Sequence, residues 1–187
     1  MKILDSVNYL KSSTSDAHLK LHSNKLLGQL MSKEITLSEY REIIQKFHQL
    51  YLSMFESLFG TEFDHSFLKV TIEKLELDIQ ALGIKENSSE DLCLEIKNYD
   101  DYLGLKYVLE GSKLGAIRIR ENLFKCLELD RNSGMAFYCV DDQQTKLEWM
   151  DFIKHLEESH SSIETVTNKA LEVFSLIDTL FSSEDKS

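Results

Sequence analysis

The sequence predicts an all-α protein, a single-domain helical bundle. Proline, the strongest helix breaker, is absent from all 187 residues. Apolar residues recur with a period nearer 3.6 than 2 over most of the chain, which indicates helices rather than strands. Met135–Val140 is the one segment whose aromatic and β-branched content favours extended backbone, and it is too short to make a sheet.

The first two helices are predicted by apolar spacing and by capping residues. Apolar periodicity predicts a helix from about Asp5 to Met31. A second helix is expected over Leu37–Phe59, because Thr36 and Glu39 have the spacing of a capping box and Gly60 is a stop signal.

Polar clusters and glycines separate the remaining helices. These are expected at Ser66–Leu82, at Glu90–Ile96 as a short helix, from Asp100 to Leu129, at Gln144–Glu158 and at Ser162–Phe181. The helical domain thus covers residues 1–181, and the polar end at residues 182–187 is expected to be disordered.

Composition excludes several classes of function. The net charge of −11 argues against nucleic-acid binding, because a phosphate backbone is bound by clustered Lys and Arg. No apolar run approaches the roughly 20 residues of a membrane-spanning helix, and the first residues are too polar for a signal peptide. Cys93, Cys126 and Cys139 form no C-x-x-C pair and are expected to be buried, reduced thiols. We therefore expect a cytoplasmic protein with no membrane or nucleic-acid partner.

One histidine on the first helix is a candidate ligand. Lys11, Thr14, His18 and Leu21 are spaced three and four residues apart, so they share a helix face in line with the apolar stripe. His18 is therefore expected to point inward. It could be a hydrogen-bonded core histidine, a heme ligand or, with His22 one turn later, part of a zinc site, although no H-E-x-x-H or cysteine pattern supports zinc.

Three glycines lie on one face of the long helix. Gly104, Gly111 and Gly115 are in line with Val108, and each glycine costs roughly 0.5–1 kcal/mol of helix stability relative to alanine. Such a face allows either close packing of another helix or contact with a flat ligand. An inward histidine on one helix and this face on another would form the two sides of a heme pocket.

Four segments carry a resemblance to a known family. "LKSSTSDAHLKL" (residues 10–21) resembles the L-R-x-x-T-x-x-x-H segment of bacterial heme oxygenases, and "YVLEGSKLGA" (residues 107–116) resembles their Y-V-x-E-G-S-x-L-G-G. "SGMAFYCVDDQQTKLEWMDFIKHLEE" and "NKALEVFSLIDTLF" are similar to later segments of the forms associated with bacterial phytochromes. The four segments follow the family's order and span residues 10 to 181.

The resemblance implies roles for residues on the first helix. His18 takes the place of the proximal ligand of the heme iron. Lys11 stands where the family has a basic residue that pairs with a heme propionate, although many relatives have arginine there. Thr14 matches the threonine of the same motif and joins them as a heme-contacting residue.

The resemblance also implies roles on the long helix. Gly111 and Gly115 would lie over the distal face of the heme, with Ser112 in the place where animal enzymes carry an aspartate that organises distal water. Ala116 departs from the family's second glycine. By its spacing Arg118 continues the glycine face, where it could pair with a propionate, contact a distal water or be a solvated charge at the rim of the pocket.

The function that the resemblance implies is that of a heme oxygenase. Such an enzyme opens noncovalently bound heme b, which is both cofactor and substrate, to biliverdin, and releases iron and CO using O2. Electrons have to come from a ferredoxin, a flavodoxin or a flavoprotein reductase, because the chain has no flavin or iron–sulfur motif. The alternatives are a heme carrier or another enzyme on the same fold, and a helical interaction module whose glycines only pack helices.

Overall fold

The computed structural model describes residues 4–85 and 92–183. These residues form helices and connecting loops, without any strand, so the predicted all-α class is confirmed. The helices are α1 (Leu4–Ser23), α2 (Lys25–Gln29), α3 (Leu37–Leu58), α4 (Ser66–Leu82), α5 (Tyr99–Leu127), α6 (Asp142–Glu158) and α7 (Ile163–Ser182).

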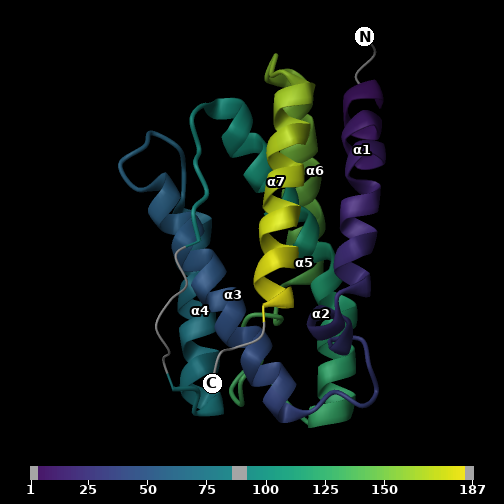
Figure 1. Ribbon diagram of the computed structural model, residues 1–187, viewed down its shortest axis with the longest axis vertical. Helices are drawn as coiled ribbons and strands as arrows, with labels where there is room; N and C mark the ends of the chain where they lie inside the picture. The colour runs from purple at the N-terminus through teal and green to yellow at the C-terminus, as the bar shows by residue number, and fades with distance from the viewer. Residues whose placement is uncertain (1–3, 86–91, 184–187) are drawn as a thin grey trace.

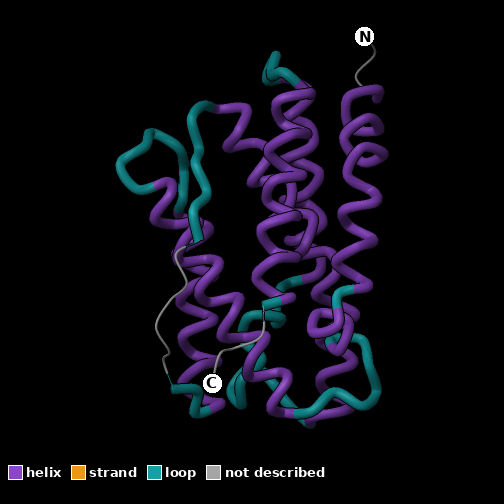
Figure 2. The backbone as a smooth tube through the Cα atoms, viewed as in Figure 1, coloured by secondary structure: helices purple, strands orange, loops and turns teal. Residues whose placement is uncertain are grey.

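Helix α7 is central to the bundle (Figure 1). It packs against α5, which also contacts α6, and against α1. Helices α3 and α4 pair on the other side of the molecule, and loops lie mainly at the two ends of the bundle (Figure 2). No helix in the described part of the chain is long and apolar enough to cross a membrane.

The helix predicted from Asp5 to Met31 is broken at Asn24. The Asn24 side chain accepts hydrogen bonds from the N–H groups of Leu26 and Leu27 at 3.1 and 3.2 Å and so caps α2. Its amide also donates to Ser182 at 3.0 Å on α7. Asparagine favours such caps over helix interiors because its side chain competes for backbone N–H groups, and here α7 holds it in place.

The predicted capping signals of the next two helices are confirmed. Thr36 and Glu39 form a reciprocal capping box at the start of α3. Gly60 follows the end of α3 with φ 81°, and Gly83 ends α4 with φ 63°, a left-handed conformation that glycine adopts without steric cost.

The short helix predicted at Glu90–Ile96 is wrong for its described part, because residues 92–97 form a loop without regular secondary structure. Ser53 on α3 donates to the carbonyl of Leu92 at 2.6 Å, and Lys169 on α7 donates to the carbonyl of Glu95 at 2.8 Å. These side chains take the carbonyls that a helix would use, so tertiary contacts override local propensity. Residues 90 and 91 lie outside the described residues.

The segment after α5 is not extended. Residues 136–138 form a turn in which Cys139 N–H donates to the Met135 carbonyl at 3.2 Å. Asp78 on α4 is fully buried and accepts the N–H groups of Ala136 and Phe137 at 2.6 and 2.9 Å, which anchors the turn. Burial raises the pKa of Asp78 although both hydrogen bonds act in the opposite direction.

Two further expectations concern the end of the chain and the thiols. Helix α7 continues to Ser182, and Lys46 donates to the carbonyl of Ser183 at 3.1 Å, so the expected disordered tail begins no earlier than residue 184, outside the described residues. All three cysteines are free, but Cys93 is exposed and Cys126 and Cys139 are only half-buried. The prediction of buried thiols is therefore wrong.

Candidate functional site

His18 lies at the edge of the buried stripe of α1. Its side chain is exposed, so the prediction that it points fully inward is wrong; the buried stripe runs through Leu10 and Thr14 instead. The centroid of its ring is 4.6 Å from the ring centroid of His22 and 6.1 Å from that of Phe174 on α7. No hydrogen bond to the His18 ring is found among the described residues, which speaks against a hydrogen-bonded core histidine.

The surroundings of His18 favour its neutral form. Partial burial of the ring, and next the nearby His22, lower the pKa of His18. A neutral imidazole is the form that binds a metal ion. The described residues contain no group of three or more His, Cys, Asp or Glu side chains that could hold a metal, which argues against the zinc alternative.

Thr14 joins α1 to α5. It is buried, donates to the Leu10 carbonyl at 2.8 Å and shares a hydrogen bond of 3.2 Å with the hydroxyl of Tyr107. The hydroxyl that the sequence offered for heme contact therefore serves first to hold two helices together. Lys11, one turn earlier, is exposed and has no ion pair among the described residues.

We expect Thr14→Val to destabilise the protein by about 1 kcal/mol, because the buried hydroxyl of Tyr107 loses its partner. Thr14→Ser keeps the hydroxyl and is the matched control. Urea unfolding of the two variants measures the difference. Equal midpoints for Thr14→Val and Thr14→Ser would show that this hydrogen bond does not hold α1 to α5.

The three glycines of α5 have different surroundings. A Cβ added at Gly104 would lie 2.6 Å from the Val166 carbonyl oxygen and 2.7 Å from the Lys169 Cβ, both on α7. Gly104 therefore allows close helix packing. A Cβ at Gly111 would meet only the Trp149 ring, at 3.6 Å, and a Cβ at Gly115 would have no atom within 4 Å. The packing interpretation holds at Gly104, and open space lies over Gly115.

The polar residues beside the glycines differ in whether other side chains hold them in place. Ser112 and Arg118 are exposed, and Ser112 Oγ donates to the Leu109 carbonyl at 2.7 Å. Arg118 has no ion pair in the described part of the chain. Arg120, in contrast, is held at the start of α6, where it donates to both carboxylate oxygens of Asp142 at 3.1 Å and to the Val140 carbonyl at 2.9 Å.

Two sets of hydrogen bonds bracket the space between α1 and α5. At one end, Thr14 of α1 shares a hydrogen bond with Tyr107 of α5. Further along both segments, Asn122 of α5 donates to the carbonyls of Leu30 and Ser32, which follow α2, at 3.0 and 2.8 Å. The order of these bonds shows that α1 and α5 run in the same direction.

One face of α5 and one turn of α1 lie between these two sets of hydrogen bonds. Tyr107, Gly111, Gly115, Arg118 and Asn122 are spaced three or four apart and share one face of α5. Tyr107 at one end of this face bonds to α1, and Asn122 at the other end bonds to the loop after α2, so the two glycines lie on the side of α5 between these bonds. His18 follows Thr14 by one turn on the same face of α1 and so lies in the same interval.

Three solved structures share this architecture. They are the heme oxygenase from Leptospira interrogans (17% identity, 95% of this chain and 98% of that chain covered, TM-score 0.72), heme oxygenase-1 from the cyanobacterium Synechocystis sp. in complex with heme (14%, 94% and 90%, 0.70), and the NO- and CO-bound heme oxygenase from Neisseria meningitidis (16%, 97% and 94%, 0.74).

The chain has the heme oxygenase fold. Neither a protein-family profile nor a curated protein sequence matches it. At 14–17% identity the likeness establishes the fold, and an argument for function has to come from the residues of the site.

On this heme oxygenase fold, two aromatic residues that were not predicted from the sequence border the site. Tyr107 carries the bond to Thr14, and the Trp149 ring lies 5.7 Å from the Tyr107 ring and against Gly111. Both fall in segments that resemble the family, but nothing in the spacing of Trp149 on α6 shows that its side chain reaches across to the glycine face of α5.

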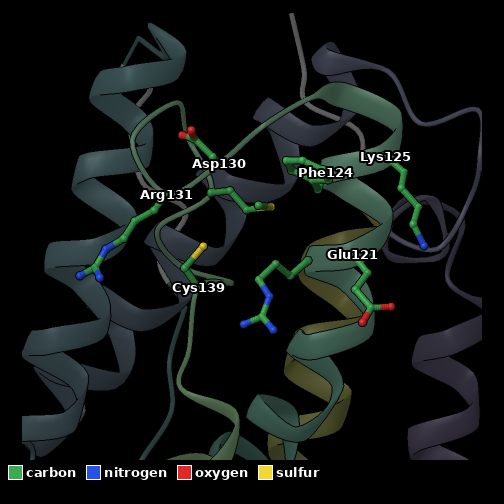
Figure 3. Close-up of a pocket in the computed structure, with 8 residues that line it drawn as sticks. Glu121, Phe124, Lys125, Asp130, Arg131 and Cys139 are labelled. Atoms are coloured by element: carbon green, nitrogen blue, oxygen red, sulfur yellow. The ribbon is translucent and has the colours of Figure 1, made fainter.

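Two hollows among the described residues lie elsewhere on the heme oxygenase fold. One, of about 510 Å³, lies between the C-terminal half of α5 and the turn that follows it, with Phe124 and Cys139 on opposite sides (Figure 3). The other, of about 250 Å³, is lined by polar residues of the α5 start and α7. Neither is lined by His18, Gly111 or Gly115.

The bracketed interval nevertheless fits heme in its chemistry. Among the described residues it offers an imidazole that makes no hydrogen bond and whose pKa is lowered, a helix face without side chains at Gly115, and two cations without an ion pair, Lys11 and Arg118, for carboxylates. An imidazole ligand on one side and an uncrowded face on the other are what a heme with an open axial position requires.

Proposed function

We propose that the protein is a heme oxygenase that binds heme b without a covalent bond, in the interval between the Thr14–Tyr107 and Asn122 brackets. The reaction opens the macrocycle to biliverdin and releases iron and CO, with O2 and externally supplied electrons. One observation carries the proposal: His18 lies one turn after Thr14, which bonds to Tyr107 of α5, and a side chain at Gly115, two turns after Tyr107, would meet no atom within 4 Å.

The residues of the interval divide the work. His18 binds the iron, and bound heme supplies the metal at which O2 is activated. Gly115 leaves room for O2 beside the α5 backbone, and Gly111 lets the Trp149 ring lie against that backbone. Ser112 Oγ donates to the Leu109 carbonyl and also interacts with the buried Tyr51 hydroxyl, which leaves it one lone pair to hold a water. Thr14 sets the spacing of the walls through its bond to Tyr107.

Electrons come from a separate protein, which we propose to be a ferredoxin, a flavodoxin or a flavoprotein reductase. With a net charge of −11, docking of an acidic partner depends on local cations. Arg120 is occupied by Asp142, so Lys11 and Arg118 remain for this role. The free thiols of the three cysteines support a cytoplasmic location.

The experiment is a hemin titration followed by addition of reductant and O2. A heme oxygenase gives a saturable one-to-one heme spectrum and then biliverdin, with CO and chelatable iron. A heme carrier of the same fold binds heme but leaves it intact, and a packing module binds none. Either of these results contradicts the proposed function.

Lys11→Ala is expected to weaken hemin binding by no more than about tenfold, because an exposed ion pair contributes about 0–1 kcal/mol. If Lys11 also helps to seat the ring, the variant gives a mixture of biliverdin isomers. Hemin titration and product chromatography measure both effects, with the exposed Lys20, which pairs with Asp178 at 2.7 Å, changed to Ala as control. Unchanged affinity and isomer pattern would remove Lys11 from the site.

A further inference from the structure

We propose that Trp149 is a positioning residue that seats the macrocycle, so that its indole decides which edge of the ring lies against α5. This inference rests on the proposed function and concerns the same site. Trp149 is the only tryptophan of the chain and reaches the site from α6.

The position of the indole is defined by contacts on three sides. Its six-membered ring is the only group that a Cβ at Gly111 would meet, through Cζ3 at 3.6 Å and Cη2 at 3.8 Å. The ring lies 5.7 Å from that of Tyr107 at an interplanar angle of 45°, and 5.9 Å from that of Phe152. Both neighbours are buried, so the indole is wedged between rigid elements.

These contacts close one end of the bracketed interval. Tyr107 holds Trp149 on one side and Thr14 of α1 on the other. Helices α1, α5 and α6 therefore meet at Tyr107, and the indole covers Gly111 while Gly115, one turn further on, is left open. A planar ligand that lies on the glycine face is confined to the Gly115 side, with its edge against the indole.

A rigid stop at this place determines the rotation of the ring. Seating by propionates alone depends on exposed cations such as Lys11 and Arg118, and exposed ion pairs are weak. An indole that packs against Tyr107 and Phe152 presents a flat apolar wall that only some edges of an unsymmetrical ring can meet without a clash. Trp149 is thus expected to bias which meso carbon comes nearest to the α5 backbone.

The test compares Trp149→Ala and Trp149→Phe with Met150→Ala. Met150 is the next residue on α6, 64% exposed, and serves as the matched control. Hemin affinity is titrated, and the seating is read from the hyperfine-shifted heme methyl protons of the ferric cyanide complex by NMR, without turnover. Melting of the apoproteins shows whether each variant still folds, and chromatography of the biliverdin isomers gives the outcome of turnover.

Trp149→Ala is expected to weaken hemin binding about three- to tenfold and to change one dominant set of heme methyl resonances into two or more. Trp149→Phe, which keeps an aromatic wall, is expected to restore the dominant set, and Met150→Ala to match the wild type. If Trp149→Ala unfolds, Trp149→Leu takes its place with the same expected change in seating.

Failure of the inference is distinguishable from failure of the proposed function. A wild-type protein that binds no hemin overturns both. A wild-type protein that binds and degrades hemin, with the same methyl resonances and the same product isomers in the Trp149 variants, overturns the positioning role of Trp149 and leaves the proposed function standing.

Discussion

His18→Ala is expected to lose the axially ligated ferric heme spectrum completely and to form no biliverdin. The imidazole has no hydrogen-bond partner among the described residues, and its pKa is lowered by burial and by His22, so it is available as a neutral ligand. Because the side chain is exposed, its removal should change the free energy of unfolding by no more than about 0.5 kcal/mol. Absorption spectra and single-turnover assays, with circular dichroism of the apoprotein, measure these effects.

His22→Ala is the matched control for this experiment. The two rings are 4.6 Å apart on the same helix, so His22 is the nearest alternative ligand. It should keep the wild-type heme spectrum, and added imidazole should restore the spectrum of His18→Ala by filling the vacated position. A His18→Ala variant that keeps the wild-type spectrum while His22→Ala loses it would assign the iron to His22 instead.

Local signals in the sequence were enough for most of the fold. The capping box at Thr36 and Glu39 and the glycines at positions 60 and 83 act within one helical turn, so they can be read without knowing what the helix packs on. The absence of proline likewise bears on every helix at once. These features predicted the all-α class and most helix boundaries to within a few residues.

The two errors in the helix assignment have a common cause. Asn24 breaks the first helix because its amide is held by Ser182, which lies far along the chain on α7. Residues 92–97 form a loop in which Ser53 and Lys169 hydrogen-bond to the carbonyls of Leu92 and Glu95. In both cases a side chain far along the sequence determines the local backbone conformation. The residues around each segment do not indicate which partner that is.

The site shows the same limit. Spacing predicted that His18 shares a face with Thr14 and that the glycines share a face of the long helix. Spacing did not show that the Thr14 hydroxyl hydrogen-bonds to Tyr107. It also did not show that His18 lies at the edge of the buried stripe rather than within it. Nor could it separate the three glycines, since Gly104 differs from Gly115 only in what α7 brings near it.

Gly104→Leu and Gly115→Leu are expected to have opposite effects on the stability of the apoprotein. At Gly104 the first side-chain atom would already lie 2.6 Å from a backbone carbonyl of α7, so leucine should force α5 and α7 apart. Overpacking of this kind costs typically about 1–3 kcal/mol, and a backbone obstacle places Gly104→Leu at the upper end, with or without heme.

At Gly115 we expect the opposite order of effects. A side chain there meets no atom within 4 Å, so Gly115→Leu should leave the apoprotein as stable as the wild type, or raise its stability by about 0.5–1 kcal/mol through helix propensity. The cost falls on the ligand, because leucine fills the space that O2 needs. Hemin should still bind through His18, whereas biliverdin formation should stall.

Melting curves of both apoproteins and of their hemin complexes, together with single-turnover spectra, separate stability from turnover. An apo Gly115→Leu protein that unfolds well below the wild type would mean that this part of α5 packs against protein, as Gly104 does. The open space over Gly115 would then be no heme site. A stable Gly115→Leu protein that binds hemin and turns it over at the wild-type rate would place O2 away from this glycine and contradict the assignment of the α5 face.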